Sequence, residues 1–198
     1  MNDTGRIEAF SDGVFAIAIT LLILEIKVPH EVSAGRLGTA LIHEWPSYLA
    51  FLASFFTIAV MWMNHHRLFT LIGAADEVLM GLNLLLLLGV TWIPFPTAVL
   101  AEHLTTTNDR TAGVFYAGSF FVMSIVFQVL WRYTIRTPGL LLTDKIEEAR
   151  AILRQYMGGP LFYLAAVLIA LASGTACLVW SLLVAIYFAL PPRLWSRR

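Results

Sequence analysis

Charge and cysteine are both scarce in this sequence. Only 13% of its 198 residues are charged, whereas 59% are hydrophobic, and a soluble domain usually carries about 25% charged residues. A surface with so little charge does not stay in water by itself, so the chain is expected to lie mostly in lipid. The single cysteine, Cys177, excludes an internal disulfide framework and a cysteine-based metal site. The formal net charge of zero gives no reason to expect a nucleic-acid partner.

Catalytic motifs are missing as well. The sequence has no glycine-rich phosphate loop, no H-E-x-x-H and no G-x-S-x-G, so we expect neither an enzyme nor a bound cofactor. The adjacent pair His65-His66 is the one feature that suggests a metal site. Neighbouring residues on a helix point about 100° apart, so the pair cannot bind one ion from a single face. A structural hydrogen-bonding role is favoured.

What the sequence does contain is a series of long hydrophobic runs. A bilayer core requires about 20 apolar residues per helix, and only helices satisfy their own backbone groups there. We therefore predict an all-α, polytopic membrane protein that forms one transmembrane domain over residues 1–198. Its six transmembrane helices are expected at about 6–28, 45–68, 76–100, 112–133, 147–172 and 175–190. Residues 30–44 are expected to form a loop, and Pro94 and Pro96 to kink the third helix.

Basic residues indicate the orientation. With six spans both termini lie on one side of the membrane, and cytoplasmic loops carry the excess of Lys and Arg. Ten of the 13 basic residues fall on the side of the termini. These are Arg6, Arg67, Arg132, Arg136, Lys145, Arg150, Arg154, Arg193, Arg197 and Arg198. The other side has Lys27, Arg36 and Arg110. This distribution predicts a multi-pass protein of the cell (inner) membrane with cytoplasmic N- and C-termini.

Polar residues lie at a similar depth in three of the expected spans. Ser11 and Asp12 belong to the first, Asn64 and His65 to the second, and Asn83 to the third. One interpretation is a hydrogen-bond network that holds the helices together. Another is that Asp12 binds an ion or relays protons, since carboxylates inside membranes are often functional. The second interpretation would make the chain a secondary transporter or proton-coupled carrier. A third is a membrane scaffold without transport.

An aliphatic stripe follows Asp12 in the first span. Ile17, Leu21, Leu24 and Val28 recur at the spacing of one helical face, and Thr20 borders that face. Such a stripe is most often a packing seam between helices. Periodicity alone does not indicate that it lines a pore.

The first span resembles the signature of a known channel family. The residues that carry the resemblance are Arg6-x-x-x-Phe10-Ser11-Asp12-Gly13-Val14-Phe15-Ala16-Ile17-Ala18-Ile19-Thr20-Leu21-Leu22. The family is that of the endolysosomal potassium channel transmembrane protein 175, and especially its bacterial members, which are single six-span units. The resemblance extends to Trp62-x-Asn64-His65-x-Arg67 and to the Asn83 to Pro96 stretch, and is weakest over the last two spans.

This resemblance implies a homotetramer in lipid whose four first helices surround a pore for the permeant ion, K⁺. It implies that rings of Ile17, Leu21 and Leu24 narrow the pore, and that the Thr20 hydroxyl contributes near the narrowest part. It also implies a structural hydrogen-bond network around the pore helix. The residues matched to that network are Arg6, Phe10, Ser11, Asp12, His65, Asn83 and Trp92.

The resemblance also affects the expected selectivity. A cation that passes an apolar ring must shed water with little compensation from the wall, and potassium holds its water less tightly than sodium. The resemblance therefore predicts a modest preference for potassium. Glu25, at the end of the first span, is expected at the extracellular mouth, where it would attract cations.

Overall fold

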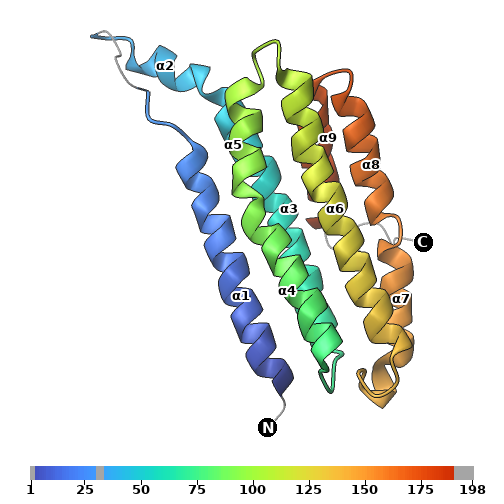
Figure 1. Cartoon of the computed structure of the whole chain (residues 1–198). Coiled ribbons are helices and arrows are strands. Elements are labelled where there is room, and N and C mark those ends of the chain that lie inside the picture. Colours follow the sequence, from blue (N-terminus) through green and yellow to red (C-terminus); the bar gives the residue numbers. More distant parts are fainter. Residues whose placement is uncertain (1–2, 30–33, 190–198) are drawn as a thin grey trace, which may run out of the picture.

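The computed structural model describes residues 3–29 and 34–189 as a bundle of helices (Figure 1). In chain order the elements are α1 (Asp3–Leu21), the 3₁₀ helix η1 (Leu22–Glu25), α2 (Leu37–His43), α3 (Trp45–Phe69), α4 (Glu77–Trp92), α5 (Pro94–His103), α6 (Asp109–Arg136), the 3₁₀ helix η2 (Thr143–Lys145), α7 (Ile146–Tyr156), α8 (Gly159–Ala170) and α9 (Gly174–Ala189). The described part of the chain contains no strand, only one isolated bridge between Ile72 and Leu141. The predicted all-α class is confirmed.

Five helical stretches are long and apolar enough to cross a membrane. They are Thr4–Glu25, Trp45–Phe69, Glu77–His103, Asp109–Arg136 and Thr143–Ala170. The last apolar helix, α9, is shorter, with 16 residues. The predicted end of that helix at residue 190, and Arg193, Arg197 and Arg198, lie outside the described residues.

The first helix ends earlier than predicted. The α-helical part stops at Leu21, a 3₁₀ turn continues to Glu25, and Ile26 has an extended backbone. The prediction of helix to Val28 was therefore wrong. Pro29 keeps only the residue before it, Val28, out of the helical region, so the proline accounts for the end of the predicted helix but not for the change to 3₁₀ helix at Leu22. The extended segment covers more distance per residue than a helix does, so the span is not shortened in proportion.

Two other segments differ from the prediction, and a third agrees with it. The expected loop 30–44 contains a short helix, α2, whose residues are all at least partly exposed. The third span is interrupted at Ile93, between α4 and α5, as the predicted kink requires, because Pro94 and Pro96 lack the N–H groups that would continue the ladder. The fifth span divides into α7 and α8 at Met157-Gly158, where glycine weakens the helix.

Two long helices hold the bundle together: α6 packs against α4, α5, α7, α8 and α9, and α3 packs against α1, α5 and α9. Helix α1 lies at one edge of the bundle (Figure 1). At the centre, Ser54 of α3 lies 2.8 Å from the Thr97 hydroxyl of α5 and 3.1 Å from the Tyr116 hydroxyl of α6. All three side chains are fully buried. Because lipid provides no partners for buried hydroxyls, these bonds favour a unique packing of the three helices. On the opposite edge from α1, α8 packs against α6 (Figure 1).

Asp76 joins the start of α4 to the last turns of α6 at the end of the bundle where the chain begins. Its carboxylate accepts hydrogen bonds from the backbone N–H of Leu79 at 2.7 Å and from the Tyr133 hydroxyl at 2.6 Å. The first bond caps the N-terminus of α4, where N–H groups have no partner within the helix. The second ties α4 to the end of α6. These two bonds hold the pKa of Asp76 below its ordinary value of 3.8.

Acid should therefore weaken this cap. Because the folded-state pKa is depressed, the carboxylate stabilises the fold above about pH 4, and this contribution disappears as the pH falls through the depressed pKa. Thermal unfolding in detergent from about pH 7 to about pH 3 should show Asp76→Asn below wild type at neutral pH, with the gap closing in acid. Glu77→Gln, one residue further on the exposed first turn, is the control. A gap that does not change with pH would contradict this assignment.

Candidate functional site

The two faces of α1 differ sharply in their surroundings. One face is buried against α3 and α4 and carries Thr4, Ser11, Phe15, Ala18 and, in η1, Leu22. The opposite face is exposed along its whole length. It carries Arg6, Phe10, Gly13, Ile17, Leu21 and, in η1, Leu24. No described residue covers this face, although most of it is apolar and belongs to a helix of membrane-spanning length.

The predicted constriction residues all lie on this exposed face. The exposed fractions are 59% for Ile17, 43% for Leu21 and 67% for Leu24. Leu24 follows Leu21 through the 3₁₀ helix, in which residues three apart lie directly above one another. The change from α to 3₁₀ helix therefore keeps Leu24 in line with Leu21. The side chains form one aliphatic row with steps of about 6 Å along the axis.

Thr20 is exposed beside this row. Its hydroxyl donates to the backbone carbonyls of Ala16 at 3.0 Å and Ile17 at 2.9 Å. Since the one hydroxyl proton is engaged by the helix, the oxygen is left with its lone pairs as acceptors. The exposed face thus combines aliphatic side chains with a hydroxyl oxygen that can coordinate an alkali cation.

A chain of hydrogen bonds anchors the opposite, buried face. His65 of α3 lies 2.8 Å from the amide oxygen of Asn83 on α4, the Asn83 amide donates to the Ser11 hydroxyl at 3.0 Å, and Ser11 donates to the carbonyl of Ile7 at 2.8 Å. The amide oxygen can only accept, so the Nε2 of His65 carries the proton. In the neutral ring Nδ1 is then an acceptor, and it has no partner among the described residues. The direction of every bond from His65 to α1 is therefore fixed.

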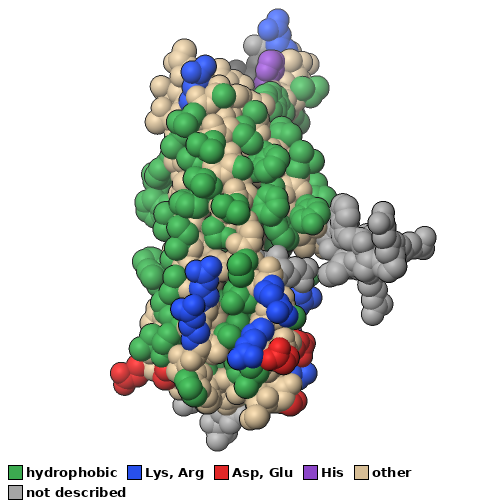
Figure 2. All heavy atoms as spheres, turned by 90° about the vertical axis from the view of Figure 1, so that its right-hand side faces the viewer, with side chains coloured by type: hydrophobic (Ala, Val, Ile, Leu, Met, Phe, Trp, Pro, Cys, Tyr) green, Lys and Arg blue, Asp and Glu red, His purple; other side chains and the backbone are tan. Residues whose placement is uncertain are grey.

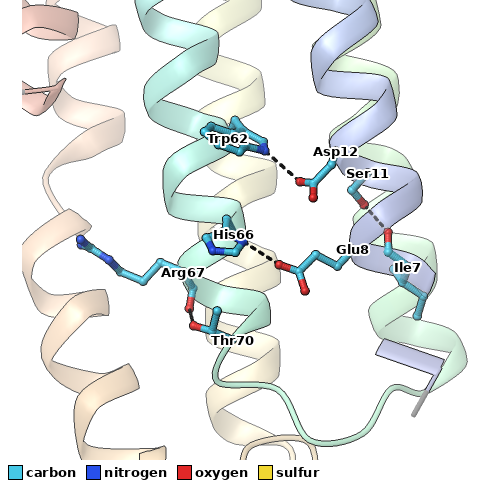
Figure 3. A network of polar contacts seen from close by, with 8 residues as sticks. All are labelled: Ile7, Glu8, Ser11, Asp12, Trp62, His66, Arg67 and Thr70. Atoms are coloured by element: carbon cyan, nitrogen blue, oxygen red, sulfur yellow. Dashed lines mark hydrogen bonds and ion pairs between the residues drawn. The ribbon is translucent and has the colours of Figure 1, made fainter. Parts of the chain in front are cut away.

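Two polar contacts join α1 to α3 beside this chain (Figure 3). Asp12 accepts from the indole N–H of Trp62 at 2.8 Å, and one turn below, the Glu8 carboxylate accepts from Nδ1 of His66 at 2.7 Å. Each helix contributes residues four apart, which lie on one face. The Trp62 and His66 rings stack with centroids 6.2 Å apart. These paired contacts fix both the height and the rotation of α1 against α3.

The structure brings together only some of the predicted network residues. Ser11, Asn83 and His65 form one continuous chain, and Asp12 lies beside it with Trp62. Arg6 and Phe10 point to the exposed face instead, and within the described residues Arg6 makes no hydrogen bond or ion pair. Trp92 lies at the far end of α4, where it donates to Ser119 of α6 at 3.3 Å.

The contact between Glu8 and His66 was missed in the sequence. Glu8 lies four positions before Asp12, and His66 lies four positions after Trp62. Residues four apart share a helical face, so this matched spacing on the two helices is the signal that would have indicated a second contact beside the one between Asp12 and Trp62. The two adjacent histidines serve different partners, His65 in the buried chain and His66 in the exposed contact. Among the described residues no group of three or more metal-ligand side chains occurs.

A polar hollow lies at the other end of α1. Glu25 of η1 lines a space of about 290 Å³ together with Lys27, His43, Glu44 and Glu102. The hollow is bounded by η1, the start of α3 and the end of α5. Glu25 is half-buried there rather than projecting freely into solvent.

Comparisons with known proteins agree with one another. The family model described as "Endosomal/lysosomal potassium channel TMEM175" matches residues 6–94. The chain is 49% identical over 193 residues to the potassium channel Cha6605_3372 of Chamaesiphon minutus, covering 96% of this chain and 95% of that one. It is 44% identical over 191 residues to the potassium channel B446_29190 of Streptomyces collinus, covering 95% and 92%. The fold matches the crystal structure of a lysosomal potassium-selective channel TMEM175 homolog from Chamaesiphon minutus with a TM-score of 0.87 and 48% identity, covering 99% of both chains.

Proposed function

The chain belongs to the TMEM175 family of ion channels, as the signature in its first helix predicted, and from that premise we propose that it forms a potassium-preferring cation channel. It is a multi-pass membrane protein and not an enzyme. In our proposal four copies assemble with α1 of each lining a central pore, and potassium flows passively down its electrochemical gradient. The pore uses no resident cofactor, and K⁺ is present only as the permeant ion.

The observation that carries this proposal is the uncovered face of α1. A helix that merely spanned lipid would not need its opposite face locked by three separate sets of polar contacts to α3 and α4. Small residues at Ala9, Gly13 and Ala16 on the exposed face allow helices to approach closely. Four such faces around an axis would enclose a narrow passage lined along its length by the row of Ile17, Leu21 and Leu24.

The passage would select ions by the cost of removing water. Rings of four isoleucine or leucine side chains offer a cation no ligand, so an ion crosses them only after losing part of its hydration shell. Potassium loses water more easily than sodium, and the barrier is therefore lower for potassium. Four Thr20 oxygens beside the rings would return part of the lost coordination. This mechanism gives a preference for potassium that is weaker than that of a carbonyl filter.

The polar contacts would serve to hold the rings in place. The rotation of α1 decides which side chains face the axis, and one residue of error corresponds to about 100°. Asp12 is bonded to Trp62 in this arrangement, which supports a positioning role rather than the ion-binding role of a transporter. Glu8, Ser11 and Asp12 hold one half of α1, and the constriction follows within the next three turns.

The proposed membrane placement follows from the basic residues. We infer that α9 is the sixth span, that both termini are cytoplasmic, and that the chain lies in the inner membrane. Of the basic residues assigned to the cytoplasmic side, Arg132 and Arg136 belong to the last turns of α6, which ends at the same end of the bundle as the start of α1 (Figure 1). Arg154 belongs to α7, which lies in the same half of the bundle (Figure 1). Lys27, which lines the polar hollow, and Arg36, which precedes α2, lie at the opposite end (Figure 1).

Reconstitution tests this function directly. Liposomes that contain the purified chain should release potassium without any coupled ion, and chemical cross-linking in the same membranes should stop at four copies. Flux that saturates and requires a proton gradient would instead indicate a carrier. A dimer as the largest cross-linked species, or vesicles that retain their potassium, would contradict the proposal.

A further inference from the structure

The exposed side of α6 carries one stripe of side chains that is aliphatic first and basic further along the helix. Val122, Ile125 and Val129 are exposed at alternating spacings of three and four residues, which keeps them on one helical face. The same spacing continues to Arg132 and Arg136, which are also exposed. One face of α6 is thus aliphatic over two turns and then presents two guanidinium groups. Such a change is expected where a lipid-facing helix passes from acyl chains to headgroups.

The segment formed by α7 and α8 shows the same change in the opposite chain direction. Its exposed stripe has alternating spacings of four and three residues and runs through Arg150, Arg154, Met157, Leu161, Leu164, Leu168 and Leu171. The arginines lie on α7 and the leucines on α8 and just after it. Because α8 runs antiparallel to α6 and packs against it, the arginine parts of both stripes lie in the same half of the bundle.

The surface view agrees with this assignment. Figure 2 shows hydrophobic side chains over the upper part of the face that carries α6, α7 and α8, and Lys and Arg side chains gathered below them. Residues 132–154 contain five basic and three acidic residues, a net charge of +2. Two of the acids are engaged locally, Glu147 by Arg150 and Glu148 by Lys145. Among the described residues, Arg132, Arg136 and Arg154 make no ion pair.

We propose that this arginine cluster binds the headgroups of anionic phospholipids, with their acyl chains along the two aliphatic stripes. The cluster is defined as Arg132, Arg136, Arg150 and Arg154. Guanidinium groups bind phosphate oxygens in pairs of parallel hydrogen bonds, and basic residues just beyond a hydrophobic span attract anionic lipid. The segment formed by α7 and α8 lies on the edge of the bundle opposite α1, and α6 packs against it (Figure 1). With α1 at the central pore, this edge of the bundle faces lipid in the proposed tetramer. The inference rests on the proposed function in this respect.

Lipid binding tests the proposal without measuring flux. The full chain is placed in nanodiscs of phosphatidylcholine with a minor fraction of phosphatidylglycerol, and native mass spectrometry counts the phosphatidylglycerol that stays bound. The double variant R132Q/R154Q removes one unpaired arginine from each stripe. It should bind phosphatidylglycerol about thirty-fold more weakly than wild type, since each basic residue near an anionic surface contributes about a factor of five.

The control uses the same helix. Arg110 is exposed at the opposite end of α6, so Arg110→Gln removes one charge, as Arg132→Gln does, and should change phosphatidylglycerol binding less than twofold. Arg132→Gln alone should weaken binding about fivefold. Equal unfolding temperatures in pure phosphatidylcholine would show that the variants fold. Wild-type binding by R132Q/R154Q, or the same loss in Arg110→Gln, would overturn the proposal. If the protein conducts no potassium but still binds phosphatidylglycerol through these arginines, the proposed channel function is contradicted and the lipid site is not.

Discussion

Replacing Ile17 by asparagine should raise the permeability to sodium relative to potassium by about tenfold, which corresponds to about 1.4 kcal/mol. In the proposed tetramer the substitution exchanges a ring of four isoleucines for a ring of four amides. Amide oxygens coordinate a partly dehydrated cation, so the sodium ion no longer loses water without compensation. The side chain is exposed in the single chain, and the substitution therefore leaves the core of the bundle intact. Bi-ionic reversal potentials in planar bilayers measure the ratio.

Leu168→Asn provides the matched control for this prediction. Leu168 of α8 is 60% exposed, against 59% for Ile17, but it lies on the edge of the bundle farthest from α1. The control introduces the same amide into lipid and should leave selectivity unchanged. Leu21→Asn should act in the same direction as Ile17→Asn, because both residues belong to one row. Unchanged selectivity in both α1 variants would remove this row from the ion pathway.

The row itself could be predicted from sequence because periodicity is a local property. Ile17, Leu21 and Leu24 repeat at helical spacing, which places them on one face. The exposure of that face does not follow from the spacing, because an apolar stripe is most often a packing seam, and it was found only in the structure. The end of the helix was harder to place. Pro29 restricts only the residue before it, whereas the 3₁₀ turn from Leu22 to Glu25 lies against α3 and α5, and the sequence of the first span does not show those neighbours. The short helix α2 was missed because its seven residues bury nothing and leave no periodic apolar face.

The partners of the polar residues depend on how helices are arranged in space, which periodicity does not encode. The resemblance placed Arg6 and Asp12 in one network on the same helix, but the partner of Asp12 is Trp62, fifty positions away. Trp92 was grouped with the network because of the resemblance, whereas the length of α4 separates it from Asn83 by more than two turns. Depth in the membrane could be estimated from sequence, and it correctly placed Ser11, His65 and Asn83 at one level.

Asn83→Ala should be the most damaging single substitution in the anchoring network. It removes the acceptor of His65 and the donor to Ser11 together. His65 is fully buried and its Nδ1 already lacks a partner among the described residues, so the ring would lose its one hydrogen bond. An unsatisfied buried donor costs about 1–3 kcal/mol, and the vacated side-chain volume adds a cavity cost. We expect a loss of about 2–4 kcal/mol in the free energy of unfolding, measured by unfolding in detergent.

The consequence should extend from stability to assembly, and this distinguishes an anchoring role from simple packing. Without the bridge from α4, the polar contacts that hold the rotation of α1 are those to α3, and the exposed row is held less firmly in one direction. Cross-linking should then give fewer tetramers even below the unfolding temperature. Asn64→Ala is the control, because Asn64 is buried one residue before His65 but makes no side-chain hydrogen bond within the described part of the chain. If Asn64→Ala and Asn83→Ala lost stability and tetramers equally, the bridge between α3, α4 and α1 would not be what positions the row of Ile17, Leu21 and Leu24.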